Sequence, residues 1–144
     1  RAAMLMVLIG AALGSGPAAS SGTAMEPPAA IAAADAASSN GRTGRFVMTV
    51  VSTAKTARGT FLNSTDDYRR PDDLTFDLSR VAANELAKRY GAPPEVYFKG
   101  RHIVVDGVVR RNLIVNTVSG RAHSVNRYQH VVRIQHPQQI VAVD

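Results

Sequence analysis

The order of the predicted elements constrains the fold more than any other feature of this sequence. Apolar and β-branched residues alternate with polar ones in three short segments, which predicts strands at 45–54, 60–62 and 74–78. Two long segments, Arg101–Val118 and Val125–Gln135, flank a turn and predict a final hairpin. The sequence therefore predicts three strands, an intervening segment and a long hairpin.

The intervening segment has the residues of a well-bounded helix. Ser79 is a favourable N-cap, apolar residues recur at helical spacing in Arg80–Tyr90, and Gly91 ends the segment before Pro93 and Pro94. One helix between the third and fourth strands is the arrangement of an OB barrel, whereas a β-sandwich needs about seven strands. We therefore expect a mainly β fold, a five-stranded OB-type β-barrel with one helix between strands 3 and 4.

The amino-terminal residues have the order of a secretory signal peptide. Arg1 precedes the apolar run Ala2–Leu13, and small residues follow as far as Ala24, with cleavage expected after Ser21 or Ala24. The run is shorter than the roughly 18 residues of a spanning helix, so no stable membrane span is expected after cleavage. We expect a periplasmic or secreted protein, and an uncleaved anchor is the alternative.

Composition defines three regions and excludes several kinds of chemistry. Residues 1–24 are the expected signal peptide, 25–40 a linker with a short Ala-rich helix at Ile31–Ser38, and 41–144 the barrel domain. The chain has no Cys, which excludes disulfides, thiol catalysis and Cys-based zinc sites. The formal net charge of +6 favours anionic partners, although it also serves solubility alone.

The late hairpin is the first candidate binding element. From Arg101 onward the only acidic residues are Asp106 and Asp144, so the hairpin is strongly basic. Cationic groups with a tyrosine suit a groove for an anionic polymer, whereas the alternative is that arginines protect a long exposed edge from pairing. The candidate residues here are Arg110, Arg111, Arg121, Arg127 and Tyr128.

The charged loop at 66–73 is the second candidate. Tyr68 beside Arg69 and Arg70 suits stacking on a ring and contact with an anion. The alternative is a loop whose four aspartates neutralise its own arginines, and the spacing does not match a calcium loop. Lys55 and Arg58, in the expected first turn, are further candidate contacts.

The sequence contains no recognisable catalytic motif. A G-x-S-x-G elbow and an H-E-x-x-H zinc motif are both missing. A calcium-dependent nuclease that uses Asp77 and Arg69 is a minor hypothesis, because no glutamate partner lies on a strand. We therefore predict a non-enzymatic protein with no cofactor and no metal.

Four segments carry a resemblance to a known group. The region from Ile31 to Asp144 resembles small exported bacterial proteins of OB-fold, nucleic-acid-binding-like type, which implies a fold more than a function. The segments are Ile31–Ala36, Phe61–Ser64 followed by Asp67–Arg69, Phe98–Val109, and His136–Ile140. We predict an exported binding module for an anionic ligand, either an oligonucleotide or an acidic glycan. The alternative is an envelope structural or protein-interaction domain that uses the long hairpin edge.

Overall fold

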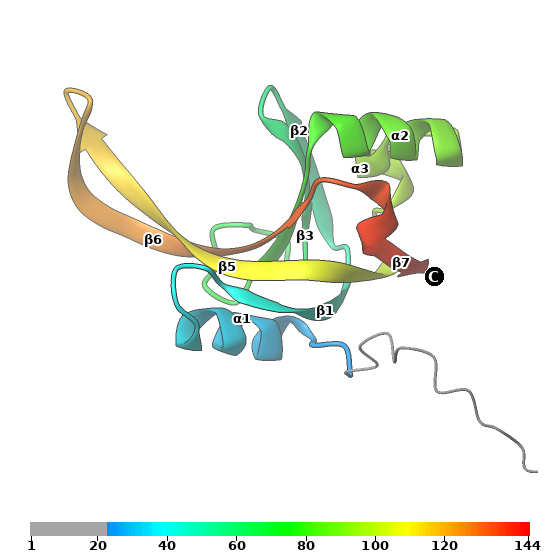
Figure 1. The fold of residues 1–144 in the computed structure, drawn as a ribbon. Helices are drawn as coiled ribbons and strands as arrows, with labels where there is room; N and C mark the ends of the chain where they lie inside the picture. Colours follow the sequence, from blue (N-terminus) through cyan, green and yellow to red (C-terminus); the bar gives the residue numbers. More distant parts are fainter. Residues whose placement is uncertain (1–22) are drawn as a thin grey trace, which may run out of the picture.

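The computed structural model describes residues 23–144 of the chain, so the expected signal peptide at 1–24 lies outside the described residues except for Thr23 and Ala24. Within the described range the fold is mainly β, as predicted, and seven strands form one sheet (Figure 1). The elements are α1 (Pro27–Ala36), β1 (Arg42–Thr49), β2 (Ser52–Thr56), β3 (Gly59–Asn63), β4 (Leu74–Leu78), α2 (Arg80–Tyr90), α3 (Pro94–Tyr97), β5 (His102–Val118), β6 (Arg121–Ile134), a 3₁₀ turn (Pro137–Gln139) and β7 (Ile140–Val143).

The strands lie in the order β1-β5-β6-β4-β3-β2, and β7 pairs with the start of β5. All neighbouring pairs are antiparallel except β4 and β6, which are parallel. The two strands at the ends of this order, β1 and β2, follow each other in the chain. One continuous segment therefore supplies both ends of the sheet.

The predicted single strand at 45–54 is divided at Val50 and Val51. The Val50 amide donates to the Arg101 carbonyl at 2.9 Å, beside β5, and the Val51 amide donates to the Asn63 carbonyl at 2.9 Å, in β3. The backbone thus changes its pairing partner between two adjacent residues. The sheet in residues 23–144 is not closed, and the predicted closed barrel of five strands is not confirmed.

Alternation along each strand separates the sheet into two faces. In β4, the side chains of Leu74, Phe76 and Leu78 are fully buried, while Thr75 and Asp77 point to the other side. We call the side with the buried residues the core face and the opposite side the outer face. The other fully buried strand residues on the core face are Phe46, Met48, Leu62, Ile103, Val105, Val109, Val132 and Ile134.

Helix α2 forms where the sequence predicts it. The Ser79 hydroxyl accepts a hydrogen bond from the Ala82 amide at 3.2 Å, and Gly91 ends the helix in the left-handed region at φ 70°. Leu86 is buried against the sheet, whereas Val81, expected on the apolar side, is exposed. The short helix α3 was not predicted, because Pro93 and Pro94 were interpreted only as terminators.

Helix α1 begins earlier than the sequence predicts and belongs to the core. Pro27 and Pro28 form its first turn, where a missing N–H is tolerated, and are not part of a linker. Ala30 and Ala34 are buried against the sheet. Gly41 lies beyond the end of this helix, at φ 78° against the Val109 carbonyl just before β1. No helix within residues 23–144 is long and apolar enough to cross a membrane.

The end of β5 and the beginning of β6, on either side of the turn that joins them, form a two-stranded arm that projects from the rest of the sheet (Figure 1). Pairing of β5 with β1 ends at Val109, and pairing of β6 with β4 begins at His130. Two register shifts interrupt the arm, between Ile114 and Val115 and between Asn116 and Thr117. We call residues 111–118 and 121–129 the arm.

Candidate functional site

A groove lies on the outer face of the sheet, between the β2–β3 hairpin, the charged loop and the root of the arm. Its volume is about 560 Å³. Phe61 in β3 and Ala54 in β2 oppose each other in register and supply part of its apolar lining. The other residues that line the groove are Thr56, Ala57, Arg58, Asn63, Tyr68, Ile114, Arg127 and Gln129.

Three of the predicted residues meet in this groove: Arg58, Tyr68 and Arg127. The Arg127 guanidinium carbon is 5.5 Å from the centroid of the Tyr68 ring, so a cation and an aromatic face lie together. The Arg127 Nε is buried and has no hydrogen-bond acceptor among the described residues.

The groove combines the groups that an extended anionic ligand needs. Arg58 and Arg127 carry positive charge, Gln129 supplies an amide that both donates and accepts, and Tyr68 offers a half-exposed ring. The Asn63 amide is buried and already accepts from the Thr75 hydroxyl and donates to the Ser52 hydroxyl. Sequence reasoning missed Phe61, Asn63, Ile114 and Gln129. The alternation in β3 was the signal for Phe61 and Asn63, since Phe61 lies between the buried residues Thr60 and Leu62 and Asn63, two residues further, shares the face of Phe61.

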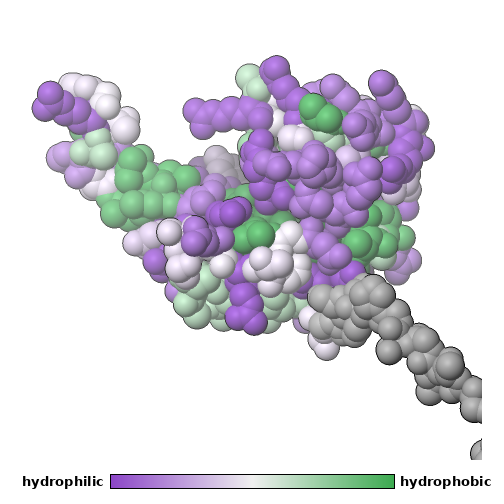
Figure 2. Space-filling model, viewed as in Figure 1, coloured by the Kyte–Doolittle hydropathy of each residue, from purple (hydrophilic) through white to green (hydrophobic). Residues whose placement is uncertain are grey.

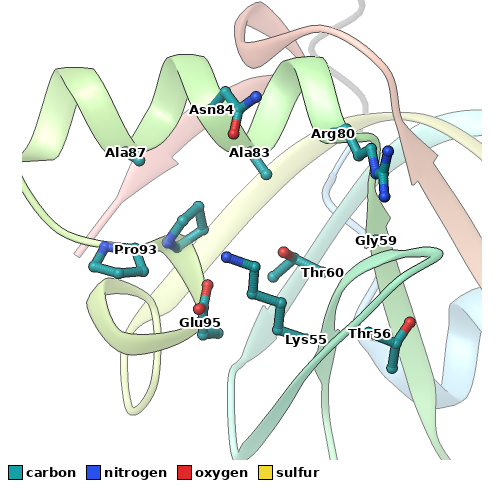
Figure 3. A pocket seen from close by; sticks show the side chains of 11 residues that line it. Lys55, Thr56, Gly59, Thr60, Arg80, Ala83, Asn84, Ala87, Pro93 and Glu95 are labelled. Carbon is teal, nitrogen blue, oxygen red and sulfur yellow. The ribbon is translucent and has the colours of Figure 1, made fainter.

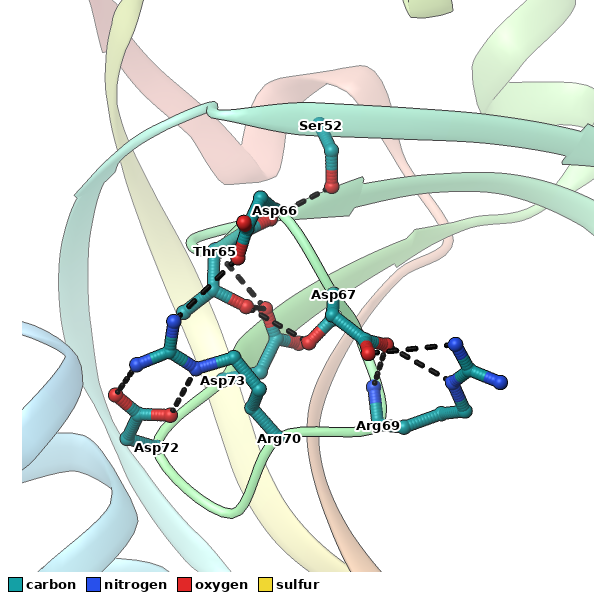
Figure 4. Close-up of polar contacts among 8 residues, drawn as sticks. All are labelled: Ser52, Thr65, Asp66, Asp67, Arg69, Arg70, Asp72 and Asp73. Atoms are coloured by element: carbon teal, nitrogen blue, oxygen red, sulfur yellow. Dashed lines mark hydrogen bonds and ion pairs between the residues drawn. The ribbon is translucent and has the colours of Figure 1, made fainter.

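Internal hydrogen bonds hold the loop that carries Tyr68 (Figure 4). The Asp73 carboxylate accepts from the Thr65 amide at 3.0 Å, from the Thr65 hydroxyl at 2.7 Å and from the Thr75 hydroxyl at 2.7 Å. Burial raises the pKa of Asp73, although these hydrogen bonds oppose the shift. The Ser52 hydroxyl adds a bond of 2.6 Å to the Thr65 carbonyl, which ties the loop to β2.

The two loop arginines are occupied by aspartates of the same loop (Figure 4). Arg69 pairs with Asp67 at 3.0 Å, and its hydrogen bonds lower the pKa of that carboxyl. Arg70 pairs with Asp72 at 2.8 Å, which lowers the pKa of Asp72 in the same way, and it also reaches Asp66. This geometry agrees with the alternative interpretation of the loop as self-neutralising, and it leaves Tyr68 as the loop residue in the groove.

Lys55 lines a different cavity, between α2 and the β2–β3 hairpin (Figure 3). This second cavity has a volume of about 390 Å³ and also contains Glu95 and Asn84. Arg80 closes one end, where its Nη2 donates to the Ala57 carbonyl at 3.1 Å. The structure thus separates Lys55 from the groove that contains Arg58.

The remaining predicted residues lie on the arm or at its root and do not line the groove. Arg111 and Tyr128 lie on the core-face side, where the Arg111 guanidinium carbon is 4.4 Å from the Tyr128 ring centroid. Arg110 is exposed at the root, in register with Val131, and Arg121 is exposed at the tip, in register with Val118. The candidate residues of the hairpin are therefore divided between the two faces of the arm.

Asp77 lies on the outer face of β4, as its alternation predicts, but it is mostly covered. Its carboxylate pairs with Arg133 of β6 at 3.1 Å, and burial raises the pKa of Asp77 despite this pairing. Arg69, its partner in the nuclease hypothesis, pairs with Asp67 instead. Among residues 23–144, no three His, Asp or Glu side chains come together as a metal-binding group.

Comparison of the chain with protein-family models, with curated proteins and with solved structures finds no match.

Proposed function

We propose that this protein is an exported, non-enzymatic OB-type binding module that holds an anionic, extended ligand in the outer-face groove. The observation that carries the proposal is the meeting of Tyr68, Arg58 and Arg127 from three separate segments in one groove. Export rests on the signal-like segment before residue 25, and absence of catalysis rests on the lack of a catalytic motif in the sequence.

The strand order supports the OB-type assignment. If β1 and β2 are the two halves of one bent strand, the order becomes 1-2-3-5-4-1, with α2 between strands 3 and 4. In OB folds, the face of strands 2 and 3 and the loops beside it bind oligonucleotides and oligosaccharides. The groove lies on the corresponding β3 surface. The β2–β3 turn and the arm, which β5 and β6 form together, flank it.

Ring stacking and charge attraction are the two interactions that this groove offers. An aromatic ring that stacks on a base contributes about 1–3 kcal/mol, and a sugar ring packs on the same surface. Arginines that contact phosphate or sulfate release counterions, so binding weakens as salt rises. Both an oligonucleotide and an acidic glycan satisfy this chemistry, and their affinities must be compared directly.

The first test measures binding of the full chain to fluorescent oligothymidylate and to a heparin oligosaccharide at two salt concentrations. We predict that Tyr68→Ala weakens binding by about 1–3 kcal/mol because the stacking surface is lost. We predict that Arg127→Ala also weakens it and lowers the slope of log affinity against log salt by about 1.

Arg89→Ala is the matched control. Arg89 is exposed in the last turn of α2 and does not line the groove, so its substitution removes the same charge at a different place. This variant should bind as the unmodified chain does. The proposal fails if neither polymer binds at low salt, or if Arg89→Ala weakens binding as much as Arg127→Ala.

A further inference from the structure

The cavity between α2 and the β2–β3 hairpin takes no part in the proposed function. Lys55 in β2 and Thr60 in β3 oppose each other in register, and alternation places both on the face opposite to Phe61, which lines the groove. Among the described residues, only Thr56 lines both spaces. The volume of about 390 Å³ lies near the lower end of the range for small-molecule sites, roughly 300–1,000 Å³. The cavity is therefore a separate space that suits a small molecule rather than a polymer.

One wall of the cavity is apolar. Ala83 and Ala87 lie one turn apart on α2, and Pro93 and Pro94 continue the wall between α2 and α3 (Figure 3). The surface over α2 is mostly hydrophilic, in contrast to this wall (Figure 2). Alanine and proline side chains have no hydrogen-bonding group, so the wall suits an aliphatic part of a ligand.

The short helix α3 holds Glu95 at the cavity. The Thr53 hydroxyl in β2 donates to the Glu95 carbonyl at 2.9 Å. The Tyr97 ring stacks on the Tyr90 ring of α2, with 4.2 Å between the ring centroids. These contacts join α3 to both β2 and α2, so the elements that carry the lining residues are fixed relative to one another, as a binding site requires.

Lys55 and Glu95 bring opposite charges to the cavity without pairing. Both side chains extend into the space between α2 and the hairpin (Figure 3). Within residues 23–144, neither of them forms an ion pair. The Glu95 Oε2 is buried and has no hydrogen-bond partner among the same residues. A carboxylate with a buried, unpartnered oxygen is costly, and a cation held beside it in the cavity would offset that cost.

This arrangement of charges indicates the class of ligand. A simple anion such as phosphate would be attracted by Lys55 but repelled by Glu95, and a simple cation would meet the reverse. Arg80 at one end of the cavity, where it donates to the Ala57 carbonyl, adds positive charge and favours a carboxylate over a neutral group. A molecule with both an ammonium and a carboxylate satisfies both charged groups at once.

We propose that this cavity binds a small zwitterion of the amino-acid type, with its ammonium beside Glu95 and its carboxylate beside Lys55. An aliphatic side chain of the ligand packs against the wall that Ala83 and Ala87 form. Asn84 on α2 supplies an amide that both donates and accepts. This inference is independent of the proposed function, because it concerns a different cavity and a different kind of ligand.

Amide chemical shifts of the labelled full chain, titrated with leucine, test this proposal. Saturable shifts should appear at Lys55, Ala83 and Glu95, while the groove signals of Tyr68 and Arg127 stay in place. N-acetyl-leucine lacks the ammonium and leucinamide lacks the carboxylate. Each should bind at least about tenfold more weakly than leucine, because each loses one charged hydrogen bond.

Two variants separate the contacts. Glu95→Gln should weaken leucine but not N-acetyl-leucine, so the preference for the ammonium disappears. Lys55→Gln should remove the preference for leucine over leucinamide in the same way. Damage to the fold would weaken all three ligands together, so the change in preference is the decisive readout. Lys88→Gln is the matched control, since Lys88 is exposed on α2 and does not line the cavity.

The ligand series on the unmodified chain decides the matter even if a variant fails to fold. The proposal is overturned if leucine gives no saturable shifts at millimolar concentrations, or if N-acetyl-leucine or leucinamide binds as tightly as leucine. It is also overturned if a folded Glu95→Gln or Lys55→Gln variant keeps its preference, or if the shifts fall only in the groove. Binding of oligothymidylate and heparin is measured separately, so failure here leaves the proposed function standing.

Discussion

Adjacent residues on a strand point to opposite faces, and this rule decides which predicted residues share a site. Arg127 lies in the groove while Tyr128, the next residue, lies on the opposite face of the arm. Sequence analysis grouped both by charge and proximity, although alternation within the predicted strand already separated them. The two register shifts in the arm were not predictable from the sequence, because they depend on the pairing itself.

The ion pair between Arg45 and Asp106 connects β1 to β5. Their side chains oppose each other in register and form two hydrogen bonds, at 2.7 and 3.0 Å. The hydrogen bond from Arg45 lowers the pKa of Asp106 below its ordinary value of 3.8. The carboxylate is therefore stabilised in the folded state, and this contribution is present above pH 3.8 and is lost as pH falls through the lowered folded pKa.

We predict that Asp106→Asn lowers the melting temperature at neutral pH, and that its difference from the unmodified chain shrinks as the solution becomes strongly acidic. Thermal unfolding of both proteins across the acid range measures this. Glu85→Gln is the control, because Glu85 is exposed on α2 and makes no ion pair among the described residues. A pH-independent deficit in Asp106→Asn would contradict the linkage.

At the scale of elements, local signals succeeded where they act alone. The limits of α2 at Ser79 and Gly91 were predicted correctly, because capping is decided by a few neighbouring residues. The division of strand 1 at Val50 and Val51 was not predicted, because it arises from a change of partner strand and leaves no mark in local propensity. Helix α1 has little amphipathic pattern, since small alanines form both its buried and its exposed sides.

Helix α1 packs closely enough that the size of its buried residues matters. Ala34 is buried against the sheet, and Ala32, two residues earlier, is exposed. We predict that Ala34→Leu destabilises the fold by about 1–3 kcal/mol through overpacking, measured by urea unfolding. Ala32→Leu should change stability by no more than about 0.5 kcal/mol. Equal effects at the two positions would show that α1 is not docked as described.

At the scale of the whole molecule, the groove is assembled from segments that are distant in the sequence. Residues of β2–β3, the charged loop and the root of the arm meet there, and in the sequence they extend from Ala54 to Gln129. The sequence predicted the segments as separate candidates, and only the sheet order shows which of them come together. The same order places Lys55 in the cavity beside α2, so proximity to Arg58 along the chain was misleading.

The most direct test of this account maps the bound polymer on the protein by amide chemical shifts of the labelled full chain. Titration with the tighter-binding of oligothymidylate and heparin oligosaccharide should shift the signals of Arg58, Phe61, Tyr68, Arg127 and Gln129 together and saturably. The same shifts should fade as salt is raised. Saturable shifts confined to the Lys55 and Glu95 cavity, or to the face of the arm that carries Leu113 and Tyr128, would contradict the account, as would no shifts at low salt.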